Sequence, residues 1–65
     1  KIADFTVPEL DYFRKTCNFV GVEIDVFELR SQGITLEEIA ERVNMSVDGV
    51  KKVSRRVNKK IIKCL

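Results

Sequence analysis

Apolar side chains recur every three or four residues through most of the chain, the spacing expected for one buried face of an α-helix. The longest series lies at the C-terminal end and consists of Val50, Val53, Val57, Ile61 and Cys64. A shorter series precedes it and consists of Leu36, Ile39, Ala40 and Val43. We therefore expect two helices, over about residues 36–43 and 47–64, that share one core.

The N-terminal half carries two shorter patterns of the same kind. The first series consists of Leu10, Phe13, Cys17 and Val20. Pro8 suits a first helical position, so we expect a helix over about residues 8–19. Gly21 breaks it, and a second helix follows over about residues 22–32, with Gly33 behind it at positive φ. The residues of this second helix expected to be largely buried are Val22, Val26, Phe27 and Leu29.

Four helices without a strand pattern predict an all-α fold, a small four-helix domain that ends in a long basic helix. The 65 residues form one domain with a modest core, and such a domain can fold independently. The first residue is Lys1 and not Met, which suggests that the domain was excised from a longer chain. The bulky groups expected in or near the core are Phe5, Tyr12, Phe13, Phe19 and Phe27.

Two expected helix starts, at Thr35 and Ser46, lie one short helix apart. Thr35 and Glu38 have the spacing of a capping box, in which each side chain bonds the backbone N–H of the other. Ser46 is a second N-cap, and Asp48 suits the positive end of the helix dipole. Between them, Asn44 tolerates the positive φ of a tight turn. This arrangement predicts that the last two helices form a helix-turn-helix.

Charge is distributed unevenly along the chain. Residues 1–44 carry five basic and nine acidic side chains, a net charge of −4, whereas residues 45–65 carry seven basic and one acidic, a net charge of +6. The whole chain is only mildly basic, at +2, but it is strongly bipolar. A basic helix suits DNA phosphates, and an acidic body favours one docking orientation. We therefore expect double-stranded DNA as the partner.

A helical wheel places most of these cations opposite the expected buried stripe. In helix-turn-helix docking, the N-terminal part of the second helix reaches base edges in the major groove. The candidates for base readout are Val47, Asp48, Lys51, Lys52 and Arg55. The candidates for phosphate contacts are Ser46, Arg56, Lys59, Lys60 and Lys63. Ser46 has an alternative role as a helix cap alone, and Asp48 as a surface residue that compensates the helix dipole.

The segment EEIAERVNMSVDGVKKVSRRVNKKI resembles region 4 of bacterial sigma factors and, less closely, the DNA-binding domain of LuxR-type regulators. The shared elements are the EIA sequence at residues 38–40, then Ser46, Val50, Lys51 and a basic tail that ends in Lys59, Lys60 and Ile61. Upstream, the E-x-x-V-x-x-L segment and closing glycine of both families are matched by Glu23, Val26, Leu29 and Gly33. The resemblance covers about residues 22–63.

The resemblance implies sequence-specific DNA binding in transcription regulation, in the cytoplasm of a bacterium or in a phage-infected cell. RNA polymerase or another regulator is the implied protein partner. The chain departs from the families in two places. Asn44 stands where glycine is usual, and the sequence ends at Leu65 without the extra C-terminal helix through which LuxR-type domains often dimerise, so we do not expect dimerisation of the LuxR type. A homodimer of another kind is an open alternative.

Residue types for catalysis and metal binding are scarce. Histidine and a glycine-rich phosphate loop are absent, and Cys17 and Cys64 lack the spacing of metal ligands. Both cysteines fall on apolar stripes, so we expect buried free thiols; a disulfide would need the first and last helices to meet there. We expect no enzyme activity, no metal and no cofactor. No stretch is long and apolar enough to cross a membrane.

Two other functions stay open. An acidic face with Glu37 and Glu41 could bind another protein, which would make the chain an interaction module that contacts the transcription machinery. The chain could also be the DNA-binding tail of a recombinase. An interaction module would not need the basic helix, and a recombinase would carry its catalytic domain elsewhere in the gene.

Overall fold

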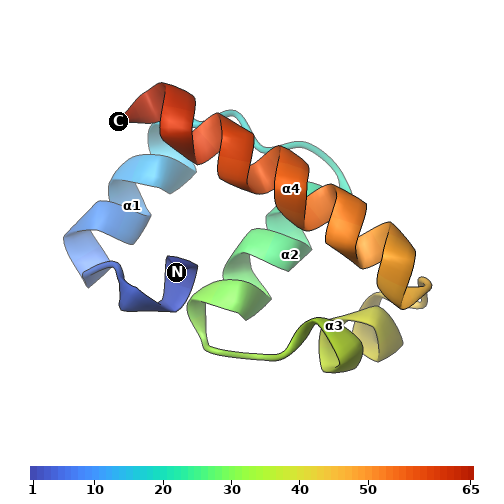
Figure 1. Ribbon diagram of the computed structural model, residues 1–65. Coiled ribbons are helices and arrows are strands. Elements are labelled where there is room, and N and C mark those ends of the chain that lie inside the picture. Colours follow the sequence, from blue (N-terminus) through green and yellow to red (C-terminus); the bar gives the residue numbers. More distant parts are fainter.

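The computed structural model describes residues 1–65 and contains helices only, so the expected all-α class is confirmed (Figure 1). The elements are a 3-10 turn η1 (Ile2–Asp4) and the helices α1 (Val7–Thr16), α2 (Val22–Ser31), α3 (Leu36–Val43) and α4 (Val47–Cys64). The expected bounds of the last two helices are confirmed, and α2 ends one residue early. The first helix differs more, because it ends three residues before the expected position.

The longest helix, α4, is the element on which the others assemble. In Figure 1 its first turns lie beside α3, its middle crosses α2, and its last turns lie beside α1. The molecule measures 29 × 18 × 16 Å. An 18-residue helix is about 27 Å long, so α4 extends along almost the whole molecule.

The core lies between α4 and the three other helices. The predicted stripe of α4 is confirmed, with its first four members buried and the last half-buried: Val50, Val53, Val57, Ile61 and Cys64. The same cluster includes Ile2, Leu10, Phe13, Val26, Phe27, Ile39 and Ala40. Burial of one large aliphatic or aromatic side chain contributes roughly 1.5–3 kcal/mol, so this shared cluster is the main attraction that holds the helices together.

Aromatic side chains support this core, with one exception. Three ring pairs are in contact: Phe5 with Phe13, whose centroids lie 4.9 Å apart, Tyr12 with Phe13, at 5.9 Å, and Phe19 with Phe27, at 4.6 Å. Tyr12, expected in or near the core, is instead half-exposed. Its hydroxyl donates to the carbonyl oxygen of Cys64 at 3.2 Å, so it satisfies a carbonyl in the last turn of α4.

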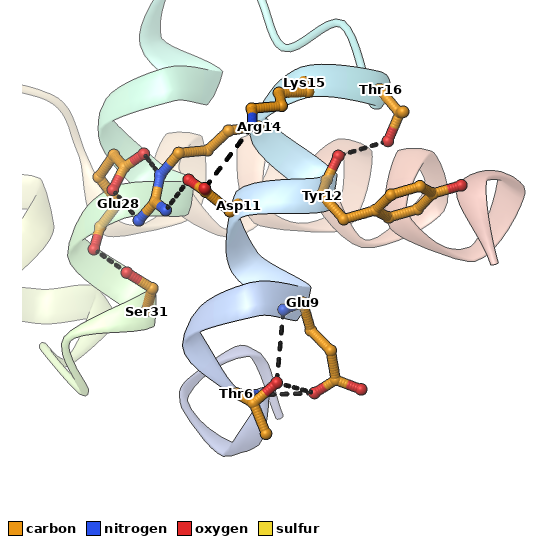
Figure 2. A network of polar contacts seen from close by, with 9 residues as sticks. All are labelled: Thr6, Glu9, Asp11, Tyr12, Arg14, Lys15, Thr16, Glu28 and Ser31. Atoms are coloured by element: carbon orange, nitrogen blue, oxygen red, sulfur yellow. Dashed lines mark hydrogen bonds and ion pairs between the residues drawn. The ribbon is translucent and has the colours of Figure 1, made fainter.

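The start of α1 is set by polar contacts and its end by a backbone reversal, neither of which the apolar pattern reveals. Thr6 and Glu9 form a full capping box, with Glu9 Oε1 2.7 Å from the Thr6 backbone nitrogen (Figure 2). Pro8 is therefore the second helical residue, not the first. At the other end Asn18 has a φ of 51°, and a left-handed residue cannot continue a right-handed helix. Val20, expected on the buried stripe, is 55% exposed, and that expectation was wrong.

An ion pair joins α1 to α2. The Nε and Nη2 atoms of Arg14 donate to both carboxylate oxygens of Glu28, at 2.6 and 2.9 Å (Figure 2). Asp11 adds a third contact at 3.3 Å, and the guanidinium lies 5.8 Å from the ring centroid of Phe27. The hydrogen bond with Glu28 raises the pKa of Arg14. This bidentate ion pair joins α1 to α2, and α2 in turn packs against α4.

The end of α2 forms as expected. Gly33 has a φ of 82°, and its backbone N–H donates to the carbonyl oxygen of Arg30 at 3.0 Å. The next N–H, of Ile34, donates to the carbonyl oxygen of Leu29 at 3.1 Å. These two bonds define a Schellman motif, whose left-handed residue favours glycine.

Candidate nucleic-acid interface

A short turn connects α3 to α4. Asn44 has a φ of 57°, as expected for the residue that reverses the chain after α3. At the start of α3, the Thr35 hydroxyl accepts the expected hydrogen bond from the Glu38 backbone N–H at 3.3 Å. The second half of the capping box does not form. The Glu38 carboxylate instead accepts from Arg42 at 2.9 Å, one turn along the helix.

The start of α4 is fixed by a side-chain cap. The Ser46 hydroxyl accepts from the backbone N–H of Gly49 at 3.0 Å, so the predicted cap is confirmed. A Cβ atom added at Gly49 would lie only 3.1 Å from Met45 Cε and 3.2 Å from Ser46 Oγ. Gly49 was not among the residues predicted from the sequence, although a side chain there would crowd the turn. Beyond the cap, Val47 is half-buried and Asp48 is exposed.

Five cations are exposed along α4: Lys52, Arg55 and Lys59 lie opposite its buried stripe, and Lys51 and Lys63 lie on the two flanks. We call them the basic face: Lys51, Lys52, Arg55, Lys59 and Lys63. All five are exposed, and none forms an ion pair or a hydrogen bond with another side chain. Four of them, from Lys52 to Lys63, follow at intervals of three or four residues. They therefore form one line along about 16 Å of helix.

Arg56 and Lys60 belong to the same helix but are engaged within the protein. Glu23, on α2, is buried, with 4% of its surface exposed. Its Oε1 accepts from Lys60 Nζ at 2.6 Å and from the backbone N–H of Val20 at 3.1 Å, and its Oε2 accepts from Arg56 Nε at 3.2 Å. The hydrogen bond from Lys60 lowers the pKa of Glu23, and those from Val20 and Arg56 lower it further. Of the cations predicted to contact phosphates, Lys59 and Lys63 are therefore free, whereas Arg56 and Lys60 are bonded to Glu23.

The burial of Glu23 is a feature that sequence reasoning missed. Glu23 precedes Val26 and Phe27 by three and four residues, so a helical wheel of α2 places it on the buried face. A carboxylate on such a face needs a cationic partner, because an unpaired buried charge is strongly unfavourable. That need could have indicated a partner among the cations of α4.

The outer face of α3 is acidic. Glu37 and Glu41 are exposed and form no ion pair with another side chain. They lie on a different element from the basic face, in agreement with the bipolar distribution of charge along the sequence. The two exposed faces of the α3–α4 pair therefore have opposite charge.

The two cysteines are free thiols at the C-terminal ends of α1 and α4. Cys17 is buried as expected, whereas Cys64 is half-buried. Burial raises the pKa of the Cys17 thiol to about 12, and a hydrogen bond with Cys64 adds to the shift. The first and last helices thus do meet at this point.

The structure contains no cluster of three or more His, Cys, Asp or Glu side chains that could hold a metal ion. None of its helices combines the length and the apolar composition needed to cross a membrane. The fold and the surface together define a small all-α domain whose longest helix carries a row of free cations. Comparisons of the chain with protein families, with curated proteins and with solved structures gave no significant match.

Proposed function

We propose that the chain is a sequence-specific DNA-binding domain of the helix-turn-helix type, in which α3 and α4 form the motif. The observation that carries this proposal is the basic face. Its five cations are exposed, have no side-chain partner in the protein and lie on the side and flanks of an 18-residue helix that face away from the buried stripe. No acidic side chain forms an ion pair with this row, and Asp48 is the one acidic residue of α4, so the row matches a polyanion.

In this proposal, α4 enters the major groove as the recognition helix. Its N-terminal turns carry Lys51, Lys52 and Arg55, whose side chains suit the acceptor atoms N7 and O6 of guanine. Lys59 and Lys63 lie further along the helix and suit phosphates, which add affinity and fix the register. Asp48 is exposed one residue after the half-buried Val47, a position from which it can accept a hydrogen bond from cytosine N4.

The charge distribution supports this orientation. The basic face lies on α4, while Glu37 and Glu41 lie exposed on α3 and would be repelled by phosphates. The resulting field turns α4 toward DNA and accelerates productive encounter. We place such binding in transcription regulation, with RNA polymerase or a second regulator as the protein partner, and we propose a binding domain and not an enzyme.

The experiment is a titration of a fluorescently labelled DNA duplex, followed by anisotropy at several salt concentrations. Each phosphate contact contributes about 0.9 to the slope of log K against log salt, so the two phosphate contacts by Lys59 and Lys63 predict a slope of about 1.8. Lys52→Gln and Arg55→Gln are expected to weaken binding, whereas Glu37→Gln, on the acidic face, is the matched control and is expected not to weaken it.

Absence of binding at low salt by the folded protein would contradict the proposal. The favoured function would then be a protein-interaction module that uses the acidic face of α3.

A further inference from the structure

Two pairs of neighbouring residues on α4 have the same chemistry and different surroundings. Arg55 and Arg56 are adjacent arginines, and Lys59 and Lys60 are adjacent lysines. The first member of each pair belongs to the basic face and has no partner in the protein. The second member of each pair is bonded to Glu23. The chain therefore contains its own matched comparison between free and engaged cations.

Glu23 is held from three directions. One carboxylate oxygen accepts from Lys60 and from the backbone of Val20, and the other accepts from Arg56. Lys60 Nζ donates in addition to the carbonyl oxygen of Asn18 at 3.0 Å, and its side chain is only 31% exposed. The two cations and the carboxylate together carry a charge of +1, so they contribute less to the surface field than two free cations.

We propose that Glu23 withholds Arg56 and Lys60 from DNA and fixes the position of α4 against α2. This inference rests on the proposed DNA binding and assigns Glu23 the role of a positioning residue. Transfer of Lys60 to a phosphate would break two hydrogen bonds and leave a buried carboxylate with one partner fewer, which is strongly unfavourable. The phosphate contacts of α4 are therefore confined to the basic face.

Arg56 is held less tightly than Lys60. It makes one bond to Glu23, at 3.2 Å, and its side chain is 56% exposed. Lys60 is therefore withheld more completely, and the contrast between Lys59 and Lys60 is expected to be larger than that between Arg55 and Arg56.

The test compares Arg55→Gln with Arg56→Gln and Lys59→Gln with Lys60→Gln in the duplex titration at several salt concentrations. Lys59→Gln is expected to reduce the salt slope by about 0.9, the value for one phosphate contact, and Lys60→Gln by less than half as much. Arg55→Gln, which removes a base contact, is expected to lower the affinity for the duplex more than Arg56→Gln does. Equal effects within each pair would overturn the inference.

Release of the withheld cations is tested with Glu23→Gln. The slope is expected to rise toward about 1.8 above wild type, because Arg56 and Lys60 can then reach phosphates. In that background, Arg56→Gln is expected to reduce the slope by about 0.9. An unchanged slope in folded Glu23→Gln would contradict the proposed withholding.

Folding of every variant is checked by circular dichroism and thermal melting. A purely structural role of Glu23 would reduce the fraction of active protein and leave the salt slope unchanged. If Glu23→Gln does not fold, the two adjacent pairs decide the question in the wild-type background. If wild-type protein fails to bind any duplex, the proposed function fails; if it binds but the pairs behave alike, only the role of Glu23 fails.

Discussion

Single residues with positive φ decide where three of the four helices end. Asn18 follows α1, Gly33 follows α2 and Asn44 follows α3, with φ values of 51°, 82° and 57°. Glycine adopts this conformation without strain, and asparagine does so at a lower penalty than most other residues. Each of these residues turns the chain so that the next helix can pack on the same core.

Asn44 gives a direct test at this scale. Asn44→Ala is expected to reduce the free energy of unfolding by about 1 kcal/mol, because alanine lacks the local hydrogen bonds that let asparagine adopt the left-handed region. Asn44→Gly is expected to match wild type or exceed it slightly, since glycine needs no such compensation. Urea denaturation measures both variants, with Asn58→Ala on the exposed side of α4 as the control. Equal stability of the alanine and glycine variants would show that the turn is not strained.

At the scale of elements, α4 is held by different means along its length. The Ser46 cap fixes its start, the apolar stripe packs its middle, and Tyr12 bonds the Cys64 carbonyl at its end. Glu23 adds a polar contact from α2. These contacts restrict rotation of α4 about its own axis, so the basic face keeps a fixed direction.

The Glu23 contact predicts a pH dependence of stability. Its pKa in the folded protein is lowered, so the contact stabilises the fold above the pKa of an unfolded glutamate, about 4.3. That stability is lost as the pH falls through the lower folded value. At pH 7, Glu23→Gln is expected to reduce the free energy of unfolding by about 1–3 kcal/mol. Urea denaturation between pH 7 and pH 3 measures both proteins.

The gap between wild type and Glu23→Gln is expected to narrow as the pH falls below the pKa of an unfolded glutamate, about 4.3, because the unfolded chain then binds a proton at Glu23 that the folded protein does not. Glu37→Gln, at an exposed and unpaired position, serves as the control for general effects of charge. A constant gap over the whole range would show that the carboxylate charge is not what stabilises the contact.

The elements differ in how far their sequence determines them. Helices α3 and α4 follow from local signals, since the caps Thr35 and Ser46 and the apolar stripes coincide with their observed bounds. The end of α1 could not be predicted from the stripe, because Val20 continues the helical spacing although Asn18 reverses the backbone. The helical wheel of α4 also predicts the row of exposed cations from Lys52 to Lys63. Which of the cations are bonded within the protein could not be predicted in this way, because that depends on Glu23, which lies 37 residues before Lys60 in the sequence.

At the scale of the whole molecule, most apolar side chains belong to a single core cluster or pack against it, as expected for so short a chain. A domain of this size has modest stability, so any ligand that binds only the folded form changes its melting temperature measurably. Under the proposed function, duplex DNA is the expected ligand.

Duplex DNA at about 100 times its dissociation constant is expected to stabilise the protein by about 2.7 kcal/mol. For a domain of this size, that corresponds to a rise of roughly 10–20 °C in the melting temperature. Differential scanning calorimetry with and without duplex measures the shift. The same DNA concentration is expected to produce a smaller shift with Arg55→Gln. A melting temperature that does not respond to DNA would contradict binding to the folded state.

The contact between Glu23 and α4 also restricts how the sequence can change over evolutionary time. A mutation that neutralises position 23 leaves position 60 with a cation but no buried partner, while a mutation at position 60 leaves a buried carboxylate short of its nearest counter-charge. Either change alone is unfavourable, and the two together are tolerated. Among descendants of this chain, positions 23 and 60 are therefore expected to vary as a pair, with the more exposed position 56 following less strictly.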